Sequence, residues 1–313
     1  ALTKGASQAA AEVTGDFAVA LCEPTGRTYL AVDRFAIQTL CYRVIDGQLR
    51  FAARADELAD AGTPIDPQAI FDYLYFHVIP SPRTIYQGIY RLPPGHYALF
   101  EDGRITVAPY WTPGFTEPPA ASFDALKDEF RSLLRSAVAT QLDGSKPACF
   151  LSGGTDSSTV AGMAALASGS TAATYSIGFD AQGYDEMEFA RIAARHFKTE
   201  HHEYYVTPAD LVRSIATVAA HYDQPFGNSS ALPAYYCAKM AREDGVSRLL
   251  AGDGGDELFG GNSRYAKQRV FGWYEHVPAF LQKGLLEPLL TTRLAAAVPL
   301  TRKGGSYVEQ ARV

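Results

Sequence analysis

The sequence has little cysteine, no long apolar run and no excess of basic charge. Its 313 residues include four cysteines, none with the CxxC or Cys/His spacing of a metal site. No apolar run approaches the ~20 residues that a membrane-spanning helix needs. The net charge of −6 gives no basic surface for nucleic acid, and the first residues lack the apolar core of a secretory signal. We therefore expect a cytoplasmic protein with reduced core thiols that binds neither nucleic acid nor membrane.

Short strands are predicted up to about Trp111. Apolar segments of strand length alternate there with turn residues. Asp46-Gly47 and Asp102-Gly103 each lie between two such segments, and Asp-Gly supplies the positive φ angles of a type I′ hairpin turn. Residues 66–77 have the cap and apolar face of a short helix. The first part of the chain is therefore predicted to be mainly antiparallel β-structure.

A proline-rich stretch over residues 112–121 is predicted to be a linker. Beyond it, apolar residues recur at helical spacing from Ser122, and strand-like segments then alternate with helical ones. This alternation predicts a doubly wound parallel α/β domain over 122–313, after a first domain over 1–111. The expected strands are 148–151, 172–179 and 247–252, and the expected helices are 157–167, 185–197 and 209–222.

The segment 151–158 carries the most chemical information. It reads LSGGTDSS, in which an apolar strand enters a Ser/Gly turn and a helix follows directly. Gly153 and Gly154 allow backbone N–H groups to face an anion, and the helix N-terminus adds partial positive charge. No lysine follows the glycines, so the segment is not a Walker A loop. Three hydroxyls add hydrogen-bond donors: those of Ser152, Ser157 and Ser158.

Acidic residues in two loops predict a magnesium site. Asp156 lies within the segment 151–158, where a carboxylate would repel phosphate unless a divalent cation intervened. A second loop, GDGGDELFGG over 252–261, follows the predicted strand 247–252. Ligands of doubly wound sheets bind beyond the carboxyl ends of the strands, so both loops can face one site. Asp156 and Asp256 are therefore predicted to bind Mg²⁺, and the absence of the EF-hand register argues against a calcium loop.

The two loops together resemble a known family. SGGTDSS is similar to the pyrophosphate loop SGGxDS of the ATP pyrophosphatase superfamily. GDGGDELFGG is similar to a loop in the synthetase domain of glutamine-hydrolysing asparagine synthetases. The segments GDFAVALCE, AVDRFAIQTLCYR and RLPPGHYALF resemble the latter part of that family's Ntn-type class II glutaminase domain. The resemblance covers nearly the whole chain and implies that the chain is truncated at both ends.

The resemblance implies an amide ligase that uses ATP and Mg²⁺. ATP would adenylate the side-chain carboxylate of aspartate, and ammonia from glutamine would then give asparagine, AMP and pyrophosphate. A homodimer is compatible with the resemblance. The implied nucleotide-binding residues are Leu151, Ser152, Gly153, Gly154, Asp156, Ser157, Ser158, Ile177 and Gly252. The implied metal ligands are Asp156 and Asp256, and the implied catalytic residues are Asp156, Asp253 and Asp256.

Several positions depart from the family pattern. The usual Asp-Glu-Pro and a later Asp appear as Asp223-Gln224-Pro225 and Asn228, which puts the identity of the substrate carboxylate in doubt. Ala1 has no nucleophilic atom, whereas the family's glutaminases begin with a cysteine nucleophile. No counterpart of the family's catalytic lysine is found, because Lys303 lies in a different context. A truncated sequence, which we favour, or a natural variant without glutaminase activity would explain both absences.

Two other functions stay open. One is an amide ligase that acts on a specialised substrate, as in β-lactam synthetases or lasso-peptide cyclases, and the altered substrate loop favours it. The other is a non-catalytic nucleotide-binding scaffold, and the intact Asp156 and Asp256 argue against it. Two further residue sets are given structural roles: a solvated loop pair, His201-His202, and a packed helix face, Tyr73, Tyr75 and Phe76.

Overall fold

The computed structural model describes residues 5–116, 120–142, 144–179, 185–261, 265, 276–283 and 288. The chain divides into two compact units, Ala1–Glu129 with Tyr205–Lys239, and Phe130–Tyr204 with Met240–Val313. Neither unit is a single continuous segment. The domain boundaries predicted at 111 and 122 stay predictions. Residues 117–119 of the predicted linker lie outside the described residues, as does Lys303.

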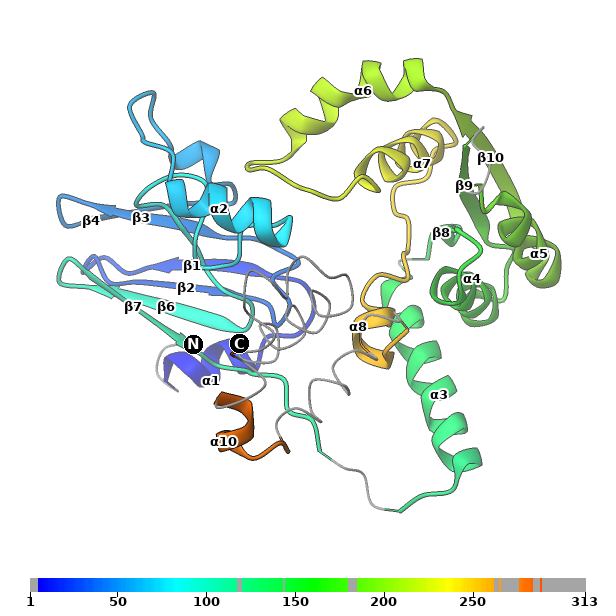
Figure 1. The fold of residues 1–313 in the computed structure, drawn as a ribbon, viewed down its shortest axis with the longest axis horizontal. Helices are drawn as coiled ribbons and strands as arrows, with labels where there is room; N and C mark the ends of the chain where they lie inside the picture. The colour runs from blue at the N-terminus through cyan, green and yellow to red at the C-terminus, as the bar shows by residue number, and fades with distance from the viewer. Residues whose placement is uncertain are drawn as a thin grey trace. The chain divides into compact units, whose positions relative to one another are not determined.

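The first unit contains two antiparallel sheets (Figure 1). Both predicted hairpins are present, and the φ angles are 50° at Asp46, 69° at Gly47, 51° at Asp102 and 75° at Gly103. The positive angles fit the type I′ turn that Asp-Gly favours. One sheet has the order β1 (Ala18–Cys22), β2 (Thr28–Val32), β6 (His96–Glu101), β7 (Arg104–Pro109). The other has the order β4 (Gln48–Ala52), β3 (Cys41–Ile45), β5 (Tyr90–Arg91).

Strand β2 is buried on both faces and contributes to two cores. Successive side chains of a strand point to opposite faces, so alternate residues enter different cores. Leu30 and Val32 pack with Tyr42 of β3, between the two sheets. Tyr29 and Ala31 pack on the other face against helix α1 (Ala6–Ala11).

Helix α2 (Pro67–Phe76) begins where the sequence predicts it. The Asp66 side chain accepts a hydrogen bond from the backbone N–H of Gln68 at 2.9 Å, which caps the helix. Of the predicted packed aromatic face, only Tyr73 packs against a buried cluster. Tyr75 and Phe76 are 66% and 54% exposed, so that prediction is wrong for these two rings. The described part of the chain covers only one side of this helix.

The second unit is built around a parallel strand pair. Strand β8 (Ala148–Phe150) pairs in parallel with β9 (Ala173–Phe179), and the sheet order is β10-β9-β8. Antiparallel sheets in the N-terminal part and a parallel pair in the C-terminal part confirm the predicted α/β fold class. Residues of β8 and of three helices share one apolar core.

The remaining elements of the two units are η2 (Asp56–Leu58), α3 (Phe123–Gln141), α4 (Thr155–Ser168), α5 (Met187–Phe197), β10 (Glu200–Val206), α6 (Pro208–His221), α7 (Ala231–Glu243), α8 (Gly255–Phe259) and α10 (Ala279–Leu281).

Two predictions about strands are corrected. The segment 247–252 makes a single parallel bridge, between Leu250 and Cys149, in place of a full strand. The pair His201-His202 is not in a loop but in the edge strand β10, where the side chains are 11% and 29% exposed. The polar sequence of β10, EHHEYYV, lacks an apolar pattern, and an edge strand needs none on its open side. Among the described residues, no helix is long and apolar enough to cross a membrane.

Candidate functional site

The two glycine-rich loops leave neighbouring parallel segments of the second unit. The backbone N–H of Phe150 donates to the carbonyl of Leu250 at 2.9 Å, and the N–H of Leu250 donates to Ala148 at 2.8 Å. Segments 148–150 and 250 therefore run side by side in the same direction. Their carboxyl ends lie at one edge, where ligands of parallel sheets bind. The first loop continues into α4, and the second continues into α8.

The first loop is ordered by its own hydroxyl groups. Ser152 Oγ and Ser157 Oγ lie 3.0 Å apart, and Ser157 Oγ also accepts from the backbone N–H of Ser152 at 3.1 Å. The backbone N–H of Gly154 donates to Ser152 Oγ at 3.3 Å. The Ser158 N–H enters the first turn of α4 by donating to the Gly154 carbonyl at 3.1 Å, so only its hydroxyl is left for a ligand. Two hydroxyls thus converge at the N-terminus of α4, where an anion is favoured.

Gly153 is required by close packing. Its φ is 85°, and a Cβ there would lie 2.5 Å from the backbone nitrogen of Ala190 and 2.6 Å from the carbonyl carbon of Phe189. The loop therefore rests directly on the start of α5. Any larger residue would push the loop away from this helix and strain its backbone.

The second loop packs against the first through glycine. A Cβ at Gly252 would lie 2.7 Å from the carbonyl carbon of Asp156 and 2.8 Å from the nitrogen of Ser157. A Cβ at Gly255 would lie 2.6 Å from the carboxyl carbon of Asp156. The structure thus brings Asp156 and the second loop together. Sequence reasoning missed Gly255, although its place in the GDGGD run, next to Asp256, is a usable signal.

Two of the predicted nucleotide-binding residues lie at the start of the first loop and on the neighbouring strand β9. Leu151 is buried, and its backbone N–H donates to the carbonyl of Tyr175 in β9 at 3.0 Å. Ile177, two residues further along β9, is half-buried. The Ser176 hydroxyl donates to the Leu151 carbonyl and fixes the junction between β8 and β9. Sequence reasoning gave Ser176 no role, and no motif marks it.

The remaining predicted acidic residues lie on the second loop. Asp253 is exposed, and Asp256 is half-buried with its side chain against the backbone of Gly261. In the described part of the chain, no group of three or more His, Cys, Asp or Glu residues is arranged so that it could hold a metal ion by itself. Magnesium needs only one or two protein carboxylates when substrate phosphates complete its coordination, so Asp156 and Asp256 fit that ion. Their pairing at one ion stays a prediction.

A buried thiol lies beneath the site. Cys149 in β8 is fully buried, and burial raises its pKa to about 12. A thiol with such a pKa is neutral near pH 7 and is a poor nucleophile. The chemistry of the site therefore depends on oxygen and backbone groups.

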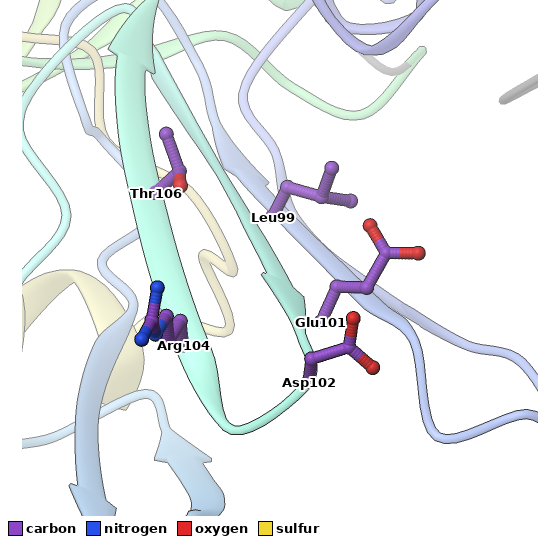
Figure 2. Close-up of a pocket in the computed structure, with 5 residues that line it drawn as sticks. All are labelled: Leu99, Glu101, Asp102, Arg104 and Thr106. Carbon is purple, nitrogen blue, oxygen red and sulfur yellow. The ribbon is translucent and has the colours of Figure 1, made fainter.

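A separate hollow of about 410 Å³ lies along the β6–β7 hairpin (Figure 2). Its lining residues are Leu99, Glu101, Asp102, Arg104 and Thr106, and all but Leu99 are exposed. Exposed charges at a hairpin turn are well solvated, and no buried polar group points to a ligand there. This hollow is not a candidate for the active site.

Two families of known proteins match the chain, one in its first part and one in its second part. The family "Asparagine synthase" matches residues 129–312, and "Glutamine amidotransferase domain" matches residues 1–111. The chain is 30% identical to asparagine synthetase [glutamine-hydrolyzing] 1 of Bacillus subtilis over 97% of its own length and 47% of that protein. It is 34% identical to a putative asparagine synthetase [glutamine-hydrolyzing] 2 of Methanocaldococcus jannaschii over 70% of its own length and 42% of that protein.

A protein named as an amidase is also similar. The chain is 28% identical to amidase chyE of Penicillium rubens over 79% of its own length and 40% of that protein. The chain spans about half the length of the curated relatives it matches. Since the first family covers more than half of the chain and includes both glycine-rich loops, the chain belongs to the asparagine synthase family.

Proposed function

We propose that the chain is the ATP-binding part of a glutamine-dependent asparagine synthetase. The protein would adenylate the side-chain carboxylate of aspartate with ATP, and ammonia from glutamine would then attack to give asparagine, AMP and pyrophosphate. The observation that carries this proposal is the packing of Gly252 and Gly255 against Asp156, which joins two oxygen-rich loops at one sheet edge. The reaction would take place in the cytoplasm, where the four cysteines would stay reduced, and Cys22, Cys41 and Cys149 are free thiols.

The residues of the first loop would bind the pyrophosphate. The hydroxyls of Ser152 and Ser157 converge within 3.0 Å of each other at the start of α4. Backbone N–H groups near Gly154 and the partial positive charge of the helix would oppose the charge that develops on the departing group. Because the loop is already hydrogen-bonded to itself, little reorganisation is needed when the nucleotide binds.

The acidic residues would hold Mg²⁺ on the phosphates. Asp156 and Asp256 would be its protein ligands, and the bound ion would act as a Lewis acid that orients the phosphates and neutralises their charge. Leu151, Ile177 and Gly252 would surround the adenosine. Asp253, exposed on the same loop as Asp256, would lie near the reacting carboxylate.

A direct test uses the full-length protein that contains this chain. With ATP, magnesium, aspartate and either glutamine or ammonium, we expect asparagine, AMP and pyrophosphate in equal amounts. Asp156→Asn should lower this activity about 100-fold or more, which is the size of effect seen when a transition-state contact is removed. AMP formation that does not depend on aspartate would contradict the proposal.

Asp124→Asn is the matched control. Asp124 is the second residue of α3, as Asp156 is the second residue of α4, so both substitutions remove the same favourable charge from a helix N-terminus. Asp124 is exposed and, among the residues that the structure describes, forms an ion pair only with Lys127, three residues later, at 2.7 Å. The control should keep full activity, and a loss equal to that of Asp156→Asn would show that the effect is not specific to the site.

The second candidate is an amide ligase for another carboxylate. Gln224 stands where the family has glutamate, and its Oε1 is buried without a hydrogen-bond partner among the described residues. A buried polar atom without a partner is costly, so this oxygen could accept a hydrogen bond from a bound substrate, which supports this candidate. AMP release with other carboxylates but not with aspartate would favour this candidate.

A further inference from the structure

The segment that joins α6 to α7 is attached to the β-rich part of the first unit by hydrogen bonds at three points. The Arg54 guanidinium donates to the carbonyl of His221 at 2.6 Å. The Asp223 carboxylate accepts from the backbone N–H of Ala55 at 2.8 Å. At the third point, the backbone N–H of Gly227 donates to the carbonyl of His77 at 3.0 Å.

An ion pair lies in the middle of this attachment. Nη2 of Arg91 lies 2.7 Å from Oδ1 and 2.6 Å from Oδ2 of Asp223. The two side chains are only 19% and 12% exposed, and the fully buried Cys41 lies beside them. A buried charge that loses its partner is strongly destabilising, so neither residue of such a pair is replaced without consequence.

Gly227 shows how closely the two segments approach. A Cβ at this position would lie 2.7 Å from both the Cβ and the carbonyl oxygen of His77. Contact between backbones at this distance leaves no room for a side chain or for water. The two segments are therefore packed in a fixed arrangement. Asp223 supplies the only carboxylate in the hydrogen bonds described above.

The bonded residues come from the two different family regions of the chain. Arg54, Ala55, His77 and Arg91 lie within the glutamine amidotransferase match, and the segment 221–227 lies within the asparagine synthase match. We propose that Arg91 and Asp223 form a clasp that holds these two regions in register and so keeps glutamine hydrolysis coupled to amide formation. Asp223 acts here as a positioning residue. This inference rests on the function proposed above.

The test combines hydrogen exchange with a product ratio, both on the full-length protein. In Asp223→Ala we expect the backbone amides of Ala55 and Gly227 to exchange at least about tenfold faster than in the unaltered protein. The amide of Ala55 loses its hydrogen-bond acceptor, and the segment that carries Gly227 loses its ion pair with Arg91. The ratio of glutamate formed to amide formed should rise at least about twofold above that of the unaltered protein. Activity with ammonium is measured beside the ratio, so that a change in the synthetase reaction itself is separated from a change in coupling.

Arginine variants separate charge from structure. A single nitrogen of Arg91 contacts both carboxylate oxygens, so the ammonium group of lysine can take its place. In Arg91→Lys the ratio of glutamate to amide should therefore stay at that of the unaltered protein. In Arg91→Gln the ratio should rise as it does in Asp223→Ala. The matched control is Asp60→Ala, which breaks an Arg–Asp pair with a 69% exposed carboxylate in the same unit and should change neither readout.

The clasp is refuted if Asp223→Ala leaves hydrogen exchange at Ala55 and Gly227 unchanged. It is also refuted if the ratio of glutamate to amide in this variant stays at that of the unaltered protein. Failure of the unaltered protein to form any amide would instead contradict the proposed function. The exchange measurement would still report on the clasp in that case, because it needs no substrate.

Discussion

Replacing Gly252 by alanine tests whether the two loops pack as tightly as the structure indicates. The new Cβ would lie 2.7 Å from the carbonyl carbon of Asp156, whereas ordinary contacts begin near 3.4 Å, so the loops must separate by about 0.7 Å. Overpacking of this kind costs about 1–3 kcal/mol. Alanine also restricts the unfolded chain more than glycine does, and this stabilises the protein by about 0.4–1 kcal/mol. At the middle of both ranges, the expected net loss of stability is therefore about 1.3 kcal/mol.

Thermal unfolding measures this loss. In a unit of about 150 residues, each kcal/mol lowers Tm by about 2–4 °C, so Gly252→Ala should unfold about 3–5 °C below the unaltered protein. Gly62→Ala is the control, because a Cβ at Gly62 meets nothing within 4 Å and its φ needs no glycine. The control should leave Tm unchanged or raise it slightly. If Gly252→Ala unfolds at the same temperature as the control, the loops do not pack as described.

Three further predictions concern stability and reactivity. Thr207→Ala removes the capping box of α6 and should cost about 1 kcal/mol in a denaturant titration. A thiol reagent at pH 8 should modify the exposed Cys22 within minutes and Cys149 only after unfolding, since burial raises the pKa of Cys149 to about 12; rapid reaction of both would contradict its burial. Hydrogen bonds from Arg191 hold the pKa of Glu203 below its usual 4.5, so their stabilising effect is complete above that value and is lost as the pH falls through the lowered pKa. Glu203→Gln should therefore lower Tm most at pH 7 and progressively less as the pH falls below 4.5, and a deficit that does not shrink as the pH falls would refute this assignment.

Local chemistry in the sequence accounts for much of the fold. The two Asp-Gly hairpins were predictable because few residues accept the positive φ angles of their turns. Helix α2 was predictable from Asp66 and Pro67, a cap and a first helical residue with known preferences. By contrast, β10 was missed because edge position, which removes the need for an apolar face, is a property of the sheet and leaves no local pattern.

The sequence by itself determined the two glycine-rich loops and the residue types from which phosphate and magnesium binding are predicted, because each depends on residues that are near neighbours in the chain. Only the tertiary structure decided that Gly255 lies against Asp156 and that Asp223 pairs with Arg91, 132 residues away. Such contacts arise when distant segments are buried together, and a single sequence contains no record of which distant groups share one environment.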